Sequence, residues 1–265
     1  MKTRLLGLFG LLRLALRTRS PVAFVVRQGR RSPGPTPYRL RGSGVVVCVR
    51  HGTDDLHTFD EVFVERQYDP PPAVEASLGR IGHPLRVADL GGNIGLFGAY
   101  AFGRFDVGEL TAYEPDPANA TVHRAAVDKN TLRWVLAEVA AGPRDGAVEL
   151  IHGGFALSRV TSEASEATTR VPMVDVFEEL RDVDVIKIDI EGGEWPILED
   201  QRMARLTATC IVAEYHPDSE YDGIPRLRAT TALQRAGFHV VPFIDRPDGT
   251  GMLWAWRDPV VDPSV

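Results

Sequence analysis

Short apolar runs alternate with longer amphipathic stretches along the chain from residue 84 onward. Five of the apolar runs have the length and the β-branched content of strands: Arg86–Leu90, Glu109–Tyr113, Arg133–Leu136, Val185–Asp189 and Thr209–Tyr215. Apolar residues at helical spacing predict helices between and after them, at 95–103, 117–128, 194–203 and 225–236. Such alternation of strands and helices predicts an α/β fold with a doubly wound, Rossmann-like sheet.

The last part of the chain departs from this alternation. His239–Ile244 and Met252–Arg257 flank a Pro-Asp-Gly turn and predict a β-hairpin. Added to the five parallel strands, the hairpin gives a mostly parallel, seven-stranded sheet with an antiparallel end. Residues 146–173 form an insertion with a Ser/Thr/Glu-rich stretch, which we expect to act as a lid or substrate loop. His152 in this insertion is a candidate for lining the substrate site.

The first 75 residues follow a different pattern. Val45–Arg50 and Thr58–Val64 alternate as strands do, and the proline-rich segment 31–37 predicts a loop. We therefore expect residues 1–75 to be an N-terminal extension of helix and strands that packs on the main domain, residues 76–265.

An apolar run near the N-terminus, Leu5–Leu12, resembles the start of a signal peptide, but arginines interrupt its continuation and no small-residue cleavage site follows. It is far shorter than the ~20 apolar residues that a membrane-spanning helix needs. One helical face is shared by Leu5, Leu8, Leu12 and Leu16. We expect residues 1–20 to form an amphipathic helix that docks on the domain or on a partner subunit of a homo-oligomer. Peripheral contact with an anionic membrane surface is the alternative.

Composition limits the setting of the protein. The 265 residues are 44% hydrophobic, which is enough to bury a sizeable core. A net charge of −6 gives the whole protein no electrostatic attraction to nucleic acid, so a nucleic-acid partner is not expected. Cys48 and Cys210 lie among apolar residues and are expected to be buried free thiols, typical of a reducing, cytoplasmic setting.

A glycine-rich turn follows the first strand of the alternating region, within Val87–Gly95. A dinucleotide fingerprint would need glycines where Asn93 and Leu96 stand, so a nicotinamide or flavin cofactor is disfavoured. The pattern that is present is Asp-x-Gly-x-Asn-x-Gly, made by Asp89, Gly91, Asn93 and Gly95.

Acidic residues end this strand and the next one. Asp89 suits the ammonium group of S-adenosylmethionine, directly or through water. Glu114, at the end of the second strand, suits two ribose hydroxyls. The glycines allow the backbone to approach the ligand closely. Together these residues predict a site for S-adenosylmethionine.

A second polar group ends two later strands. Lys187 and Asp189 belong to one buried run, and Glu214 and His216 end another. Ligands of open α/β sheets bind beyond the carboxyl ends of the strands, so we expect these side chains to gather at the edge that holds Asp89.

These motifs together resemble the FkbM-type methyltransferases of the class I methyltransferase superfamily. The resemblance rests on the glycine turn, Tyr113-Glu114-Pro115, Lys187–Glu194 and Glu214-x-His216, and it covers about residues 50–245. It implies a class I fold and S-adenosylmethionine-dependent O-methylation, often of sugars or natural-product hydroxyls. It implies cofactor contacts at Asp89, Gly91, Gly92, Asn93, Gly95, Glu114 and Pro115. Gly92 and Gly193 depart from the commoner pattern, in which larger residues stand.

Methyl transfer to a hydroxyl needs a group that takes up its proton. His216 is the first candidate for that general base, with capping of a strand end as its structural alternative. Asp189 could orient the acceptor or cap a helix, and Lys187 needs a carboxylate partner such as Asp189 or Glu214. Tyr68 could stack on cofactor or substrate, or simply pack.

Three alternatives remain open at this point. Asp189, Glu214 and His216 could bind Mg²⁺, although histidine is an unusual ligand for this ion, and we assign no metal site. RNA methylation would need a basic face, for which Arg27–Arg41 is the best segment. The chain could also be a non-catalytic subunit that binds the cofactor for stability. The remaining histidines are expected at the surface or in loops: His51, His57, His83, His123 and His239.

Overall fold

The computed structural model describes residues 7–31, 34–151, 159–161, 168–218, 221 and 223–258. Its largest sheet has seven strands in the order β12-β13-β11-β10-β3-β4-β5. The central strands are β3 (Leu85–Leu90), β4 (Val107–Tyr113), β5 (Trp134–Ala137), β10 (Val185–Ile188) and β11 (Cys210–Tyr215). These five strands are parallel.

The C-terminal hairpin completes the sheet as expected. It consists of β12 (His239–Asp245) and β13 (Gly251–Trp256), which pair antiparallel, and β13 also pairs antiparallel with β11. The predicted class I fold, with a mostly parallel seven-stranded sheet, is confirmed. The chain leaves β3 for β4 on one side and returns to β10 on the other, so the carboxyl end of β3 lies at the switch point where such sheets bind ligands.

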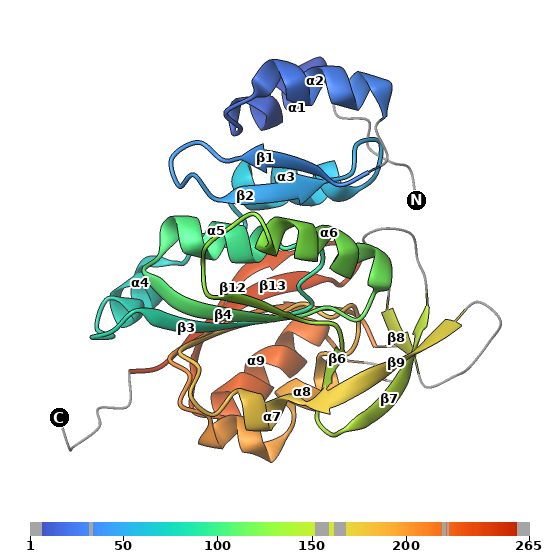
Figure 1. The fold of residues 1–265 in the computed structure, drawn as a ribbon. Coiled ribbons are helices and arrows are strands. Elements are labelled where there is room, and N and C mark those ends of the chain that lie inside the picture. The colour runs from blue at the N-terminus through green and yellow to red at the C-terminus, as the bar shows by residue number, and fades with distance from the viewer. Residues whose placement is uncertain are drawn as a thin grey trace.

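Helices cover both faces of this sheet (Figure 1). One face carries α5 (Leu96–Arg104) and α6 (Pro117–Val127), and the other carries α7 (Val176–Glu179), α8 (Trp195–Leu198) and α9 (Pro225–Arg235). The predicted helix 194–203 is wrong as one element. It is split into α8 and a 3₁₀ turn, Gln201–Arg205, because Asp200 adopts an extended conformation and its side chain caps the N–H of Arg202.

The first part of the N-terminal segment forms a layer of its own above α5 and α6 (Figure 1). This layer contains α1 (Leu8–Leu16), α2 (Pro21–Arg30), β1 (Thr36–Arg39), β2 (Val46–Val49) and α3 (Asp55–Phe63). The following helix, α4 (Pro72–Leu78), lies beside the main sheet and contacts β13 and β11. The predicted strand Val45–Arg50 is confirmed as β2, which pairs antiparallel with β1. Within the described ranges, no helix combines the length and the apolar content that crossing a bilayer requires.

The predicted strand Thr58–Val64 is wrong, because these residues lie in α3 or at its end. Leu56, Phe59 and Val62 are buried at a spacing of three residues, which places them on one side of a helix. The first core cluster joins this segment to the main sheet, since it includes Phe24 and Phe59 together with Val87. The division at residue 75 stays a prediction.

A second sheet occupies much of the region that the sequence marks as an insertion. Its order is β6-β9-β7-β8, with β6 (Ala140–Gly142), β7 (Gly146–Ile151), β8 (Arg159–Thr161) and β9 (Thr168–Asp175). Residues 152–158 and 162–167 lie outside the described residues, and so does the expected role of His152. The lid or substrate loop stays a prediction.

Candidate functional site

The glycine turn after β3 packs closely against the protein behind it. Gly91 has a φ of +83°, and a Cβ at this position would lie 1.8 Å from the carbonyl oxygen of Asp189. A Cβ at Gly92 or Gly95 would lie 2.9 Å or 2.7 Å from the ring of His123. The sequence suggested that these glycines make room for a ligand. In the structure they make room for β10 and α6, which fix the turn in place.

Glu114 is held at the end of β4 by two backbone amides. The N–H of Asn93 donates to its Oε2 (2.7 Å), and the N–H of Asp116 donates to its Oε1 (2.8 Å). Burial raises the pKa of Glu114 to about 7, while these two hydrogen bonds oppose the rise. Each carboxylate oxygen keeps a second lone pair, so the fixed group can accept hydrogen bonds from a ribose diol.

Lys187 links the cofactor turn to the acidic edge. It is buried in β10, and its Nζ lies 3.2 Å from Oδ1 of Asp89 and 3.5 Å from Oδ2 of Asp189. The same Nζ donates to the carbonyl oxygen of Gly91 (2.5 Å). Burial would lower the pKa of Lys187, but the two aspartates outweigh it and the pKa is raised. The predicted carboxylate partner of Lys187 is therefore Asp189, joined by Asp89.

Asp89 itself is fully buried behind the turn. Burial raises its pKa, and Lys187 opposes this effect. Asp89 is not among the residues that line the cleft in front of the turn, whereas Asp189 is. Direct contact between Asp89 and a cofactor ammonium group stays a prediction. The geometry shows instead that Asp89 anchors Lys187.

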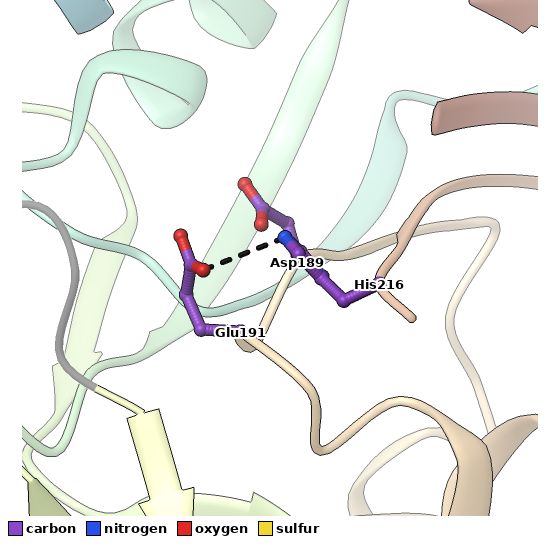
Figure 2. Close-up of side chains that lie close together, drawn as sticks. All are labelled: Asp189, Glu191 and His216. Carbon is purple, nitrogen blue, oxygen red and sulfur yellow. Dashed lines mark ion pairs between the residues drawn. The ribbon is translucent and has the colours of Figure 1, made fainter. Parts of the chain in front are cut away.

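His216 lies between two glutamates at the edge formed by β10 and β11. Its Nδ1 is 2.8 Å from Oε1 of the fully buried Glu194, and its Nε2 is 3.4 Å from Oε2 of Glu191. Figure 2 shows Glu191, His216 and Asp189 close together, with the His216–Glu191 ion pair dashed. Burial would lower the pKa of His216, but Glu194, then Glu191 and Asp189, raise it to about 10. At neutral pH the ring is therefore an imidazolium.

Burial also shifts the carboxyl groups of this edge. It raises the pKa of Glu191 to about 8, with Asp189 adding to the rise and His216 opposing it. It raises the pKa of Glu214 to about 7, with Asp189 again adding and Arg246 opposing. Glu214 pairs with Arg246 at 2.6 Å, not with Lys187. The edge therefore crowds carboxyl groups together, and a cationic ligand would stabilise their ionised forms.

One cleft brings the cofactor residues and the acidic edge together. It is lined by Gly91, Asn93, Tyr113, Glu114, Pro115, Asn119, Ala140, Ala141, Leu150, Asp189, Ile190 and Glu191. Four predicted cofactor residues are in this lining, while Gly92 and Gly95 lie behind the turn against His123. Leu150 of β7 shows that the second sheet contributes a wall. The mixture of apolar side chains and fixed carboxylates fits a nucleoside that carries positive charge.

Two glutamates of this site, Glu191 and Glu194, were not identified as site residues from the sequence. Both lie in the acidic turn after β10. Glu191 has a φ of +53°, which costs a non-glycine residue energy and is commonest at functional sites. Tyr68 approaches the edge as well: its hydroxyl donates to Asp189 (3.5 Å), and its ring packs on Phe97 (centroids 4.9 Å apart).

The buried histidines and cysteines away from this edge contribute to packing and not to the site. His123 is buried in α6, so its expected position at the surface or in a loop is wrong. His51 is buried in the turn that follows β2. His51 contacts the Tyr38 hydroxyl (2.7 Å). The buried free thiols predicted at Cys48 and Cys210 are confirmed. Burial raises their pKa values to about 11 and about 12, which keeps both in the unreactive thiol form.

Known proteins resemble this chain in sequence and in fold. The family model described as "Methyltransferase FkbM domain" matches residues 89–240. A curated protein of Beauveria bassiana (strain ARSEF 2860), "Methyltransferase 1", is 22% identical over 218 residues, which are 71% of this chain and 82% of that protein.

Among solved structures, the FkbM methyltransferase from Methylobacillus flagellatus KT aligns with 14% identity and a TM-score of 0.47, over 95% of this chain. This chain spans 59% of the length of that structure. TYW2 of M. jannaschii, solved with AdoMet, aligns with 9% identity and a TM-score of 0.42, over 86% of this chain and 88% of that one. Because the family model covers more than half of its residues, the chain belongs to the FkbM methyltransferase family.

Proposed function

We propose that this protein transfers a methyl group from S-adenosylmethionine to a hydroxyl of a saccharide or of a glycosylated or natural-product small molecule. The observation that carries the proposal is the shared cleft, which both Glu114 and Glu191 line. When bound, S-adenosylmethionine supplies an electrophilic methyl carbon on a sulfonium. The cleft supplies a place for the ribose and, beside it, groups suited to a hydroxyl and its proton.

The residues of the cleft would bind the ribose, stabilise the sulfonium and take up the proton of the acceptor. Glu114, fixed by two amides, orients the ribose, and the negative charge of Asp189 and Glu191 favours the positive sulfonium end. An acceptor hydroxyl at this edge would donate to Asp189 or Glu191. As its oxygen bonds to the methyl carbon and the carbon–sulfur bond breaks, its proton passes to the Glu191–His216 pair.

Within this pair, the predicted role of His216 as the base needs a neutral ring. The pKa of His216 is raised to about 10 and that of Glu191 to about 8, so Glu191 loses its proton first as pH rises and becomes the first available acceptor. His216 would then stabilise the ionised Glu191 before the reaction and accept a proton only after losing its own.

A divalent cation is the alternative partner of this edge. Ligand atoms of Asp189, Glu191 and His216 lie within 4.8 Å of one another, so Glu191 takes the place expected for Glu214. A cation would have to displace the proton on His216, and imidazole is a poor ligand for Mg²⁺. We therefore propose that turnover does not need Mg²⁺, and activity that EDTA abolishes and Mg²⁺ restores would reverse this assignment.

Two measurements test the function. Calorimetry with S-adenosylhomocysteine should show binding, and the absence of heat and of any thermal stabilisation would remove the cofactor assignment. Radiolabel transfer from S-adenosylmethionine should then be measured across sugars, glycosylated natural products, small amines and RNA. Label confined to hydroxyl acceptors supports the proposal. Label only on RNA or amines, or cofactor binding without any transfer, contradicts it.

A further inference from the structure

The outer side of the two N-terminal helices exposes a group of large apolar side chains. Leu8, Phe9, Leu12 and Leu16 of α1 are 69%, 85%, 43% and 60% exposed, and Val22 and Val26 of α2 are 75% and 44% exposed. We call these six residues the α1–α2 apolar face. Figure 1 shows α1 and α2 as the outermost layer of the molecule, so no other described element covers them.

The inner sides of the same helices fix this face in its outward orientation. Leu14 and Ala15 of α1 and Phe24 of α2 are buried. The Phe24 ring packs on Tyr38 and Phe59, with centroids 4.8 Å and 5.9 Å away. The helix α1 therefore docks through Leu14 and Ala15. Leu8, Leu12 and Leu16, on the face that the sequence suggested would bind the domain or a partner subunit, remain exposed.

Positive charge is concentrated in the same part of the chain. Residues 1–53 contain eleven Lys or Arg and no Asp or Glu, whereas residues 54–265 contain nineteen Lys or Arg and 36 Asp or Glu. The net charge of −6 is thus the sum of +11 for residues 1–53 and −17 for residues 54–265.

Most of the arginines of this region are exposed, and among the described residues these exposed arginines have no carboxylate within ion-pair distance. Eight of them lie between residues 7 and 41, and all eight are exposed. Across the described part of the chain, no ion pair involves any of these eight: Arg13, Arg17, Arg19, Arg27, Arg30, Arg31, Arg39 and Arg41. Their charges are available to an external anionic surface.

We propose that the α1–α2 apolar face and its surrounding arginines dock on a membrane surface that contains anionic lipids. Exposed Leu, Phe and Val side chains on helices can enter the boundary between headgroups and acyl chains, while arginines contact lipid phosphates. An RNA backbone would use the arginines but would leave the six apolar side chains in water. A symmetric contact with a second copy would bring two strongly positive regions together.

Vesicle co-sedimentation of the full chain tests the proposal, and it needs neither cofactor nor acceptor. We expect binding to vesicles of phosphatidylcholine mixed with phosphatidylglycerol, weak binding to phosphatidylcholine alone, and loss of binding as salt screens the charges. The double variant Phe9→Ser/Leu12→Ser should lower the partition coefficient at least tenfold, about 1.4 kcal/mol. Arg13→Gln/Arg17→Gln should lower it by roughly tenfold and reduce the salt dependence.

A matched control separates this face from general surface hydrophobicity. Leu132 and Val135 are also exposed, at 38% and 55%, and lie outside the N-terminal segment. Leu132→Ser/Val135→Ser should therefore bind vesicles as the wild type does, and circular dichroism should show that all variants fold.

Four outcomes would overturn the proposal. They are equal binding to both vesicle types, no binding to either, an equal loss in the control variant, and RNA binding that survives Phe9→Ser/Leu12→Ser while vesicle binding is absent. Size-exclusion chromatography adds a fifth: an oligomer that this variant converts to a monomer would show that the face joins copies of the chain.

Discussion

Replacing Glu194 by glutamine should release the proton of His216. Oε1 of Glu194 lies 2.8 Å from Nδ1 of His216, and the glutamate side chain is fully buried. A hydrogen bond to a charged partner contributes about 1.5–3 kcal/mol, and one pKa unit corresponds to 1.36 kcal/mol. Glu194→Gln keeps the shape but removes the charge, so the pKa of His216 should fall from about 10 by about one to two units.

The same ion pair should appear in the pH dependence of stability. The pKa of His216 is raised from 6.5 to about 10 on folding, so its stabilising effect is complete below pH 6.5 and is lost as pH rises toward 10. The full shift corresponds to an upper limit on the order of 5 kcal/mol. The deficit in the free energy of unfolding of Glu194→Gln should be largest below pH 6.5 and should narrow above pH 10.

Nuclear magnetic resonance of histidine-labelled protein measures this pKa directly. The Cε1 proton of His216 can be assigned by its loss in His216→Asn, and its chemical shift followed against pH. Glu178→Gln serves as the control, because Glu178 is exposed and pairs with Arg181 elsewhere. A wild-type His216 that titrates near 6.5, or one that titrates equally in Glu194→Gln, would refute the ion-pair reasoning and restore His216 as the resting general base.

Three further changes probe the cofactor cleft and the fold. Glu114→Gln should weaken S-adenosylhomocysteine binding in calorimetry by about 10- to 100-fold, because a neutral amide replaces charge-assisted acceptors of the ribose; unchanged affinity would remove the ribose assignment. Gly91→Ala should lower the free energy of unfolding in urea by at least about 2 kcal/mol, since its Cβ would meet a backbone carbonyl, whereas Gly82→Ala, with open space around it, should not. Phe24→Ala should cost about 3–5 kcal/mol if the N-terminal helices unfold together with the main core, and a separate early transition would contradict that.

The alternating part of the chain was predictable because its strands are buried on both faces. Runs such as Val185–Ile188 are continuous and apolar, and the hairpin turn is marked by proline and glycine. The segment at Thr58–Val64 was not predictable in the same way. Phe59, Val62, Phe63 and Val64 give this short window the aromatic and β-branched content of a strand. The helical spacing becomes clear only when the buried Leu56, which precedes the window, is included.

The site was predictable as a set of strand ends but not as a set of contacts. Parallel strands place Asp89, Glu114, Asp189 and Glu214 at one edge, and the structure confirms that the edge exists. The strand positions do not show which carboxylate contacts Lys187 and which lines the cleft, because this depends on how deeply each side chain is buried. Asp89 is fully buried and does not line the cleft, although it stands at the end of its strand as Asp189 does. Glu191 follows the strand in a left-handed turn, a conformation that sequence rules reserve mainly for glycine.

The contact between the Gly91 turn and the end of β10 has a consequence for engineering acceptor preference. The two segments are joined by main-chain atoms, with the N–H of Asp189 donating to the carbonyl of Leu90 (3.0 Å), and by one buried lysine beneath them. None of these links uses the side chains of Ile190 or Glu191, which face the cleft. A library randomised at Ile190, with Glu191 kept as the proton acceptor, should therefore alter which acceptors enter while the nucleoside pocket keeps its shape.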